Sequence, residues 1–513
     1  MGSALEVERK LSVGPEFALP PLEAVPGVAG VSDPEVSKLE ATYWDTDDLR
    51  LARNAITLRR RTGGCDAGWH LKLPAGADRI EIGRPLGRVR EVPEDLADLV
   101  AVHLRGAALR PVARLQTLRT AYRLRDAEGA DAAEVVDDYV HAQTLGEPGA
   151  ATGTDEWREV EVELKGTGDR ALLDAVGQAL RAAGARPAAT ASKLARLLGP
   201  RLSAGPDLPP PAGRLTPRTP AGEVVGAYVR AQVAALLAAD PRVRRHEEDA
   251  VHKMRVASRR LRSTFTTFRS LLGDGAALGD LDAELRRLAA VLGASRDREV
   301  LLDRLRAELA AQPSELVLGP VAARIEQTLL PELLRAREEG VAELRGERYY
   351  KLVEALLDLV ARLPRTGPAA GRARDVLPPL VRRVYRRLAK RVAAAEHAPP
   401  GQARDVAYHD ARKAAKRLRY AAEALAPAFG PDAAALARQA EAVQEVLGER
   451  QDAAVARPVL HELGLAAQAA EGENGFTFGL LLGVEQCRAT LAERDLAGVW
   501  RQASRRRYHR WLG

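Results

Sequence analysis

Charged and apolar side chains alternate along several short segments in the first 200 residues. In "LEVERKL" (5–11), Glu6, Glu8 and Lys10 share one face of a predicted strand, and "REVEVELKG" (158–166) places three further glutamates in the same way. Carboxylate oxygens are suitable ligands for hard divalent cations such as Mg²⁺ and Mn²⁺, and ammonium groups bind phosphate oxygens. The pattern therefore indicates phosphoryl-transfer chemistry if these charged faces turn toward a common interior.

Basic side chains recur on the segments between these two. "AITLRRRT" (55–62) projects Arg59 and Arg61 from one face, and "WHLKLP" (69–74) places Lys72 opposite the apolar residues of its segment. Taken singly, each segment is an ordinary half-buried strand with a solvated charged face. Several strands that all carry charges of both signs opposite an apolar face favour a sheet curled into a barrel with a charged interior.

A second group of cations lies in the other half of the chain and occurs twice. "VHKMRVASRRLRSTF" (251–265) and "YHDARKAAKRLRYAA" (408–422) align with each other at a constant offset of 157 residues, which matches His252 with His409. At about 100° per residue, the basic residues of each segment form a stripe that flanks the apolar face of a helix. The two segments are therefore predicted to be equivalent basic helices.

The basic stripes predict a polyanionic ligand. Cations held close together without acidic partners repel one another, and such a cluster persists most easily when a polyanion supplies the missing charge. The stripes hold no aromatic side chains that could stack on bases, which favours a phosphate-only ligand such as inorganic polyphosphate over nucleic acid. The alternatives are a solvated Arg-rich face without a ligand, and nucleic-acid binding.

The elements that must position these residues differ between the two halves of the chain. Before residue 200 the apolar pattern has period two and predicts antiparallel strands, with helical patches at 94–105 and 169–184. A linker rich in Pro and Gly is predicted at 201–219, and after it the period is 3.6, typical of a helical bundle. We therefore expect an α+β protein with two domains, at 1–200 and 220–513.

The helical half contains an internal repeat. "LGASRD" at 292–297 matches "LGERQD" at 447–452 at an offset of 155 residues, close to the offset of the basic segments. Two successive matches at nearly one offset indicate a duplicated unit, with copies at 220–363 and 375–513. Duplicated units commonly pack about a pseudo-twofold axis, which would place the two basic helices across a shared groove.

Composition excludes several other classes of protein. The chain has 513 residues, a net charge of +7 and 46% hydrophobic residues, which is typical of a folded protein rather than a disordered one. Its two cysteines, Cys65 and Cys487, match no metal-binding spacing, and no apolar run of about 18 residues is apparent. We therefore expect a protein of the cytoplasm with no membrane partner.

The two basic segments, with "LGASRDRE" and "QEVLGERQDA" in the same order, resemble the CHAD domain (conserved histidine α-helical domain) over 220–513. The resemblance implies a duplicated four-helix core whose basic central surface binds polyphosphate. The polyphosphate contacts that it implies are His252, Lys253, Arg255, Arg259, Arg260, Arg262, Arg296, His409, Arg412, Lys413, Lys416, Arg417 and Arg419.

The N-terminal "EVERK", followed in order by "YWDT", "LRRR", "WHLKLP", "LRT", "EVEVELK" and "SKLARLL", resembles the CYTH superfamily of triphosphate tunnel metalloenzymes over 1–200. The resemblance implies an eight-stranded antiparallel β-tunnel with flanking helices, which hydrolyses triphosphates with a divalent metal. The implied catalytic residues are Glu6, Glu8 and Lys10. The implied substrate ligands are Lys10, Arg59, Arg61, Lys72, Arg119 and Lys193. The implied metal ligands are Glu6, Glu8, Asp137, Glu161 and Glu163. The strand register leaves two alternatives open: Asp138, which adjoins Asp137, and Glu159, which precedes Glu161 and Glu163.

Together the two resemblances imply a triphosphatase that depends on Mg²⁺ or Mn²⁺ and hydrolyses inorganic triphosphate, with a helical half that binds inorganic polyphosphate. We expect the protein in the cytoplasm, in association with polyphosphate granules. The alternative is a polyphosphate-binding or granule-targeting protein with little or no catalytic activity. Nucleic acid is not expected as a partner.

Overall fold

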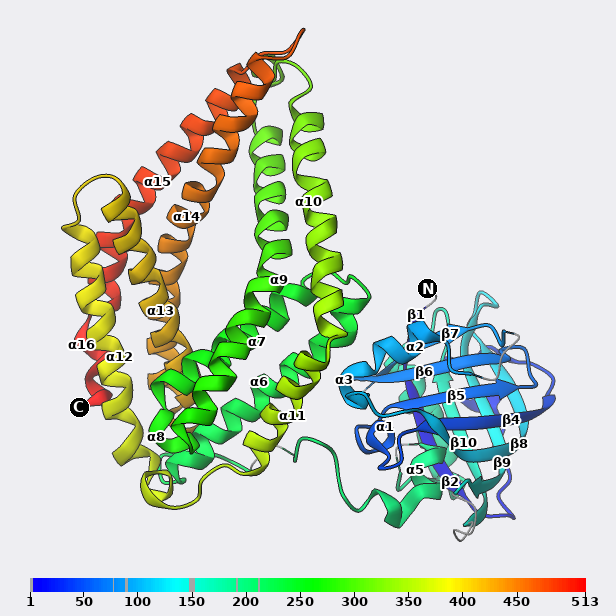
Figure 1. The fold of residues 1–513 in the computed structure, drawn as a ribbon. Helices are drawn as coiled ribbons and strands as arrows, with labels where there is room; N and C mark the ends of the chain where they lie inside the picture. Colours follow the sequence, from blue (N-terminus) through cyan, green and yellow to red (C-terminus); the bar gives the residue numbers. More distant parts are fainter. Residues whose placement is uncertain (1–2, 77, 88–90, 147–152, 191, 211–212) are drawn as a thin grey trace. The chain divides into compact units, whose positions relative to one another are not determined.

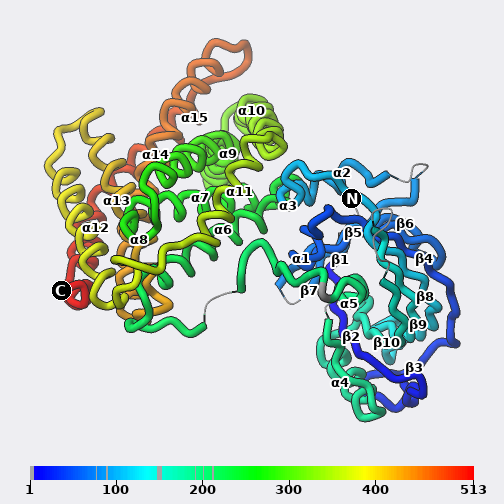
Figure 2. The backbone as a smooth tube through the Cα atoms, turned by 60° about the horizontal axis from the view of Figure 1, so that its bottom comes forward, coloured from blue at the N-terminus to red at the C-terminus, as the bar shows by residue number. Residues whose placement is uncertain are grey.

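The computed structural model of the chain describes residues 3–76, 78–87, 91–146, 153–190, 192–210 and 213–513. The chain forms two compact units, Met1–Pro209 and Pro210–Gly513. The division falls inside the Pro-rich segment between the strands and the long helices (Figures 1 and 2). The first unit is built on an antiparallel sheet and the second is helical, as the α+β prediction requires.

Eight long strands form the sheet of the first unit. The first strand is interrupted at Val7 and so consists of β1 (Ser3–Glu6) and β2 (Glu8–Val13). The others are β4 (Glu35–Asp45), β5 (Thr57–Thr62), β6 (Gly68–Ala75), β7 (Asp78–Arg84), β8 (Arg110–Arg125), β9 (Asp131–Thr144) and β10 (Thr154–Leu164). Two-residue strands β3 (Gly30–Val31) and β11 (Arg186–Pro187) add to β8 and β2.

The first strand closes this sheet into a tunnel. Around the sheet the order is β1-β7-β6-β5-β4-β8-β9-β10-β2. Because β1 pairs with β7 and β2 pairs with β10, the two ends of the order belong to one continuous segment. The prediction of an eight-stranded antiparallel tunnel is therefore confirmed.

Helices cover the apolar outer face, and this arrangement turns the charged face inward. α2 (Glu94–Leu99) and α3 (Ala101–Leu104) pack on the apolar residues of β5, β6 and β7, including Trp69 and Leu71. α4 (Arg170–Ala182) covers the apolar residues of β2, β9 and β10. Since side chains alternate across a strand, the residues between these apolar positions must face the interior.

One helix lies on the inner side of the sheet. α5 (Lys193–Leu198) buries Leu194 and Leu198 against Tyr43, Leu115 and other residues of the inner face.

The helix α1 (Arg50–Arg53) follows the end of β4 at Asp45, whose carboxylate accepts hydrogen bonds from three backbone amides nearby. Asp45 is therefore a structural residue that stabilises the turn after β4.

The second unit is a duplicated helical bundle. The first copy contains α6 (Ala221–Arg244), α7 (Ala250–Thr267), α9 (Gly275–Ala310) and α10 (Val321–Leu344). The second contains α12 (Ala373–Glu396), α13 (Gln402–Phe429), α14 (Pro431–Gln468) and α15 (Phe476–Ala503). The helix α11 (Glu347–Ala361) lies between the copies, and the short helices α8 (Arg269–Leu272) and α16 (Arg506–His509) complete the unit. The predicted duplicated bundle is confirmed.

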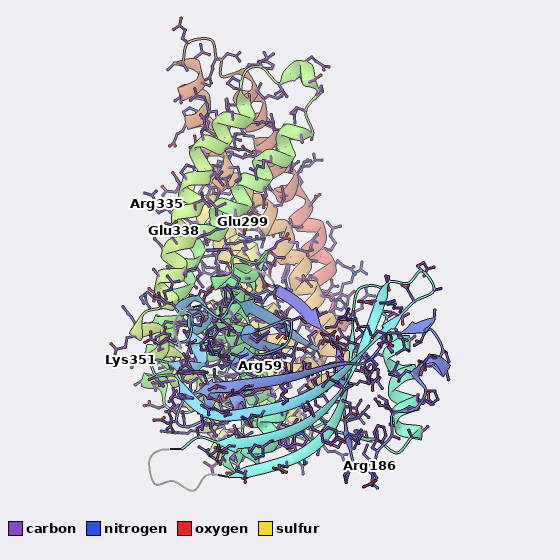
Figure 3. The ribbon with its side chains drawn as sticks, turned by 90° about the vertical axis from the view of Figure 1, so that its right-hand side faces the viewer. Arg59, Arg186, Glu299, Arg335, Glu338 and Lys351 are labelled. Atoms are coloured by element: carbon purple, nitrogen blue, oxygen red, sulfur yellow. The ribbon has the colours of Figure 1, made fainter. Side chains whose placement is uncertain are left out.

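The two copies contact each other through several helices, and α6 of the first copy packs on α12 and α13 of the second. The basic helices α7 and α13 pack against each other. The far ends of the hairpins α9–α10 and α14–α15 share one apolar cluster that includes Leu305, Leu329, Leu460 and Phe478 (Figure 1). Within the first hairpin, α9 and α10 lie side by side, as Glu299 and Glu338 illustrate in Figure 3.

One helix of the described chain, α6, has the length and apolar composition that a membrane span requires. Its 18-residue window has a mean hydropathy of 1.2, which corrects the sequence-based statement that no such run exists. In the structure 56% of that window is buried inside the protein. The apolar residues of α6 thus have packing partners within the bundle.

Candidate functional site

Strand register brings the charged residues of the first unit into one interior. β2 and β10 place Lys10 opposite Glu161 and Glu8 opposite Glu163. Opposed residues on neighbouring strands project from the same face of the sheet. Since the other face of these strands is covered by α4, all four side chains point into the tunnel.

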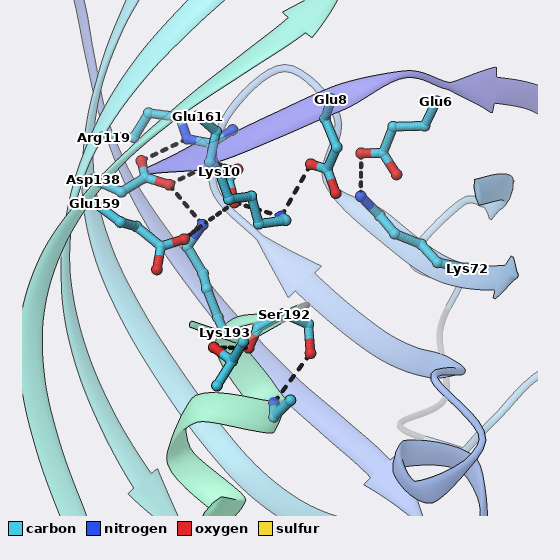
Figure 4. A network of polar contacts seen from close by, with 12 residues as sticks. Glu6, Glu8, Lys10, Lys72, Arg119, Asp138, Glu159, Glu161, Ser192 and Lys193 are labelled. Carbon is cyan, nitrogen blue, oxygen red and sulfur yellow. Dashed lines mark hydrogen bonds and ion pairs between the residues drawn. The ribbon is translucent and has the colours of Figure 1, made fainter. Parts of the chain in front are cut away.

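Lys193, the first residue of α5, lies at the centre of a buried ion cluster (Figure 4). Its Nζ is 3.0 Å from Asp138 and 2.8 Å from both Glu159 and Glu161. Lys10 Nζ lies 2.5 Å from Glu161. Burial opposes the charge on Lys193, but the three carboxylates raise its pKa well above the usual value. The Lys193 side chain is therefore a fixed positive charge inside the tunnel.

Arg119 of β8 completes this cluster. Its guanidinium donates hydrogen bonds of 2.8 and 2.7 Å to the two oxygens of Asp138 and lies 3.6 Å from Glu161. Burial alone would raise the pKa of Asp138, but Lys193 and Arg119 hold it below the usual value. The helix cap sets the position of Lys193, because Ser192 Oγ accepts a hydrogen bond from the Ala195 amide. The cluster is thus fixed by side chains of β2, β8, β9, β10 and α5.

Glu6 and Glu8 lie beside this cluster on the first strand. Lys72 of β6 donates a hydrogen bond to Glu6, and Lys10 Nζ lies 3.0 Å from Glu8. The second carboxylate oxygen of Glu6 is buried and has no hydrogen-bond partner. Burial, together with the charge of Glu6, raises the pKa of Glu163. Carboxylates gathered in this way, with an oxygen to spare, suit a hard divalent cation.

Arg59 and Arg61 form a basic wall on β5. Arg59 lies within the curled sheet (Figure 3), 4.0 Å from Glu81, and donates a long hydrogen bond of 3.4 Å to the Tyr43 hydroxyl. Arg61 contacts Asp66 in the turn before β6. The Nε atoms of both arginines are buried without a hydrogen-bond partner. Burial and the charge of Arg59 lower the pKa of Arg61 to about 9, so a bound anion would relieve an unfavourable arrangement.

The sequence-based prediction omits three inward-facing residues, Tyr43, His70 and Glu81. Glu81 pairs across the strands with Lys72, and His70 Nδ1 lies 2.7 Å from its carboxylate. Burial would raise the pKa of Glu81, but His70 and Lys72 hold it far below the usual value. The alternation of "RIEIG" already puts Glu81 opposite the apolar face, but only the pairing of β6 with β7 shows that it meets Lys72.

All but one of the predicted tunnel residues lie on the inner face. The exception is Asp137, whose carboxylate pairs with Arg158 at 2.7 Å on the outer face, where the guanidinium also lies over the Tyr139 ring. The register of β9 explains the correction, because it sets Asp138, and not Asp137, opposite Arg119. Asp138 has no exposed surface and faces the cluster. The inward-facing residues are Glu6, Glu8, Lys10, Arg59, Arg61, Lys72, Arg119, Glu161, Glu163 and Lys193.

The correction can be tested with two adjacent substitutions. For the triphosphate hydrolysis that we propose below, we expect Asp138→Asn to lower the rate by at least about 30-fold, because Arg119 and Lys193 lose their shared counter-ion and their positions. Asp137→Asn removes only an outer ion pair, so the turnover per folded molecule should stay within about twofold. Steady-state phosphate release by the two variants decides between them. An equal loss in both would contradict the assigned register.

The interior can hold a divalent cation, but it is not preformed around one. Among the described residues no group of three or more His, Cys, Asp or Glu side chains is arranged to hold a metal ion. Lys10, Lys72, Arg119 and Lys193 each have a carboxylate within 3.0 Å. An anion that enters must compete with these carboxylates for the Lys and Arg side chains. A cation bound by Glu6 and Glu8 would weaken this competition, which makes the donor set chemically suited to a metal-dependent site.

In the second unit, the two basic helices hold an arginine in the same way. On α7, Arg255 Nη1 lies 3.0 Å from Asp297 of α9. A Cβ at Gly293 would lie only 3.2 Å from the Arg255 guanidinium, so glycine leaves room for it. The second copy repeats this arrangement in Arg412, Gly448 and Asp452. The repeated "LG…D" sequence is thus explained by the packing of one arginine per copy.

The expectation that the basic stripes lack acidic partners is wrong for four of their residues. Besides Arg255 and Arg412, Arg262 lies 3.0 Å from Asp282 and Arg419 lies 2.7 Å from Glu423. Arg260, beside the stripe, lies 2.8 Å from Glu423. The partners come from neighbouring helices or from the next turn. Arg296 contacts Glu299, His409 contacts Gln451, and Lys253 and Lys413 are exposed.

A smaller central cluster of basic residues lies between α7 and α13, defined here as His252, Arg255, Arg259, Arg412 and Lys416. Among the described residues, Arg259 and Lys416 have no carboxylate within 4.0 Å, and Arg259 Nε is buried without a partner. Burial and the charges of Arg412 and Arg259 lower the pKa of Lys416 to about 7. These residues come from both repeats, so the pairing of α7 with α13 creates the unpaired positive charge.

The chain matches two known domain families and a protein of similar length. It matches the CYTH domain over residues 4–198 and the CHAD domain over residues 227–461. It is 41% identical over 504 residues to an uncharacterized protein of Mycobacterium tuberculosis, which covers 96% of this chain and 94% of the relative.

Two solved structures are similar in fold to parts of the chain. One is PptA from Streptomyces chartreusis, with a TM-score of 0.47 and 23% identity over 55% of this chain and 100% of that one. The other is the CHAD domain from the plant Ricinus communis, with a TM-score of 0.40 and 22% identity over 59% of this chain and 96% of that one.

Proposed function

The chain belongs to the CYTH–CHAD family, and we propose that it is an inorganic triphosphatase whose helical unit binds inorganic polyphosphate. CYTH domains are metal-dependent triphosphate tunnels whose members act as triphosphatases or cyclases. The single observation that carries the proposal is the convergence of Lys10, Arg119 and Lys193 on Glu161 in an enclosed interior. No other part of the described first unit concentrates charge of both signs in this way.

The inner residues fall into two roles in this proposal. Lys10, Arg119 and Lys193 exchange their carboxylate partners for phosphate oxygens, and Arg59 and Arg61 bind the far end of the triphosphate. Mg²⁺ or Mn²⁺ held by Glu6 and Glu8, with Glu161 and Glu163, would polarise the phosphate and the attacking water. Glu6 keeps one oxygen without a hydrogen bond, which leaves it able to orient a water molecule. The Lys and Arg side chains thus bind the triphosphate, and the carboxylates hold the metal ion and orient the attacking water.

A phosphate-release screen tests this function. The purified protein is given inorganic triphosphate, thiamine triphosphate or ATP, each with Mg²⁺, with Mn²⁺ or with a chelator. We expect release from inorganic triphosphate with a divalent cation and none with the chelator. Formation of cyclic AMP from ATP would assign the cyclase chemistry of the family instead.

The second candidate is a polyphosphate-binding or granule-targeting protein with little catalytic activity. The internal pairing of Lys72 with Glu6 and of Lys193 with three carboxylates favours it, because a tunnel that satisfies its own charges can persist without a substrate. It predicts tight, salt-sensitive binding of polyphosphate and no metal-dependent release of phosphate from any substrate in the screen.

Lys416 makes polyphosphate binding depend on pH. Burial and the nearby arginines lower its pKa to about 7, and a bound polyanion would restore the pKa toward the usual value. Binding therefore takes up a proton, and we expect affinity to rise about tenfold as pH falls from 8 to 6.5 or below. A Lys416→Arg variant should lose most of this dependence, because arginine stays charged throughout. Titration calorimetry in buffers of different ionisation enthalpy measures the proton uptake, and a pH-independent wild type would contradict the role of Lys416.

We place this activity in the cytoplasm, at polyphosphate granules. The two cysteines are free and exposed, which supports a reducing compartment. Competition among tripolyphosphate, long-chain polyphosphate and RNA for the purified protein tests the partner. Preference for RNA would favour the nucleic-acid alternative.

A further inference from the structure

The helix α12 presents a second row of cations to solvent. Arg383, Arg386, Arg387 and Lys390 are all exposed. The buried residues of α12, which include Val381, Val384, Leu388 and Val392, lie on the opposite side of the helix. The four cations therefore form the solvent-exposed face of α12, opposite the face that packs in the bundle.

The C-terminal segment adds five more exposed arginines next to this row. Tyr385 of α12 stacks on His509 at 4.4 Å and on Trp500 at 6.2 Å between ring centroids. Arg382 donates a hydrogen bond to the carbonyl oxygen of Gly513. These contacts hold the segment along one edge of the α12 row. We call the combined set the C-terminal arginine surface: Arg383, Arg386, Arg387, Lys390, Arg501, Arg505, Arg506, Arg507 and Arg510.

This surface gathers many cations without counter-ions. Within the described residues, no ion pair joins any of its nine members to a carboxylate. Many other arginines of the helical unit are paired, as Arg391 is with Asp410, Arg324 with Glu473 and Arg348 with Glu284. Nine cations in one area repel one another unless a polyanion is present.

The surface borders the basic helix α13, which also carries Arg412 and Lys416 of the central cluster. Arg387 lies near Arg417 of α13: burial, and then the charge of Arg387, lower the pKa of Arg417. At 100° per residue, Arg387 and Arg382 lie about 140° apart on α12, with Arg386 and Lys390 between them. One edge of the row therefore borders the basic helix α13 and the other borders the C-terminal segment.

The aromatic rings in this area pack on one another and are not free to stack on nucleic-acid bases. Tyr385, Trp500 and His509 stack on one another, and Trp511 packs on Phe429 at 5.3 Å. None of these side chains is fully exposed. Base stacking is a main source of affinity for single-stranded nucleic acid, so the surface is better suited to a ligand that consists of phosphate alone.

We propose that the C-terminal arginine surface binds the part of a long polyphosphate chain that extends beyond the central cluster. The inference rests on the proposed polyphosphate binding and adds a preference for long chains. A helix is about 10–12 Å across with its side chains, so a chain must span that width before it reaches the C-terminal arginines. The segment from 500 to 513 also lies beyond the part of the chain that matches the CHAD domain, residues 227–461.

Two matched variants of the full chain test this surface. The surface variant carries Arg383→Gln, Arg386→Gln, Arg505→Gln and Arg506→Gln. The control variant removes the same charge from exposed positions on the other copy and its connection, by Arg335→Gln, Lys351→Gln, Arg362→Gln and Arg365→Gln. Affinity is measured for polyphosphate chains of about 10 and about 100 phosphates at several salt concentrations, because a second contact region raises affinity only for chains that reach it.

We expect the surface variant to bind the long chains at least 10-fold more weakly than wild type and the short chains within twofold of it. Its affinity for long chains should also depend less steeply on salt, because fewer counterions are released. The control variant should match wild type for both lengths. Unchanged binding of the short chains shows that the helical unit of the surface variant is folded, and hydrolysis of inorganic triphosphate by the first unit should be the same in all three proteins.

Each outcome has a distinct meaning. An unchanged affinity of the surface variant for long chains overturns this inference and leaves the proposed function intact. A wild type that binds neither chain length overturns the proposed polyphosphate binding itself. If wild type prefers RNA to long polyphosphate and the surface variant loses RNA binding, the inference is overturned and the surface is reassigned to nucleic acid.

Discussion

Replacing Glu8 by glutamine is expected to lower phosphate release from inorganic triphosphate by about 10²- to 10³-fold, comparable to the loss of one well-placed charge-stabilising group in other enzymes. Glu8 lies beside Glu163 of the neighbouring strand β10 and 3.0 Å from Lys10. The amide cannot supply the negative charge that a divalent cation needs. The fold should persist, because Glu8 pairs with one lysine that keeps Glu161 as a second partner. The measurement is steady-state release with saturating Mg²⁺ or Mn²⁺.

A matched control lies on a neighbouring strand of the same sheet. Glu156 of β10 is largely exposed and contacts His141 on the outer side, so Glu156→Gln should leave turnover within about twofold. The metal dependence separates the role of Glu8 from a general effect on the tunnel. If Glu8 helps to hold the cation, the variant should need a higher metal concentration for half-maximal rate. Full turnover by Glu8→Gln at ordinary metal concentration would refute the tunnel assignment.

The inward-facing residues of the tunnel could be predicted largely from the alternation of apolar and charged residues. The prediction fails where this alternation is ambiguous. Glu6, Glu8 and Lys10 stand between apolar residues that α4 must cover, so period two alone assigns their face. In "EVVDDYV" both Asp137 and Asp138 are flanked by apolar residues, and either phase is possible. Only the pairing of β9 with β8 decides the phase, because it places Asp138 opposite Arg119. A pleat error of one residue moves a side chain to the other face of the sheet.

The helical site shows a different limit of sequence reasoning. The period of 3.6 identifies the basic stripe of one helix, but it does not show which residues neighbouring helices bring to that stripe. Asp282 and Glu423 pair with Arg262 and Arg260, and neither acid lies in the quoted basic segments near its partner. The unpaired charge that survives, at Arg259 and Lys416, depends on the contact of α7 with α13 across the repeat.

Replacing Lys193 by methionine is expected to destabilise the first unit by about 3–5 kcal/mol at pH 7, the usual cost of leaving a buried charge without its partner. Lys193 is 9% exposed and lies within 3.0 Å of Asp138, Glu159 and Glu161. Arg119 and Lys10 remain, but Glu159 loses the one lysine that contacts it. Differential scanning calorimetry of wild type and variant measures the loss. Lys38→Met on the outer face, where Lys38 is exposed, should shift the transition by less than about 0.5 kcal/mol.

The pH dependence of this loss identifies its cause. Lys193 and Arg119 depress the folded-state pKa of Asp138, and Lys10 and Lys193 depress that of Glu161, although burial opposes both shifts. Carboxylates of this kind stabilise the fold above their unfolded pKa of about 4, and the stabilisation is lost as pH falls through the folded value. Burial already raises the pKa of Glu159 and Lys193 opposes this rise, so without Lys193 the Glu159 carboxylate takes up a proton more readily as pH falls from 7 to 5, which relieves the unpaired charge. The stability gap between wild type and Lys193→Met should therefore narrow as pH falls over this range. A gap that stays constant or widens would show that lost packing, and not the buried ion cluster, makes Lys193 important.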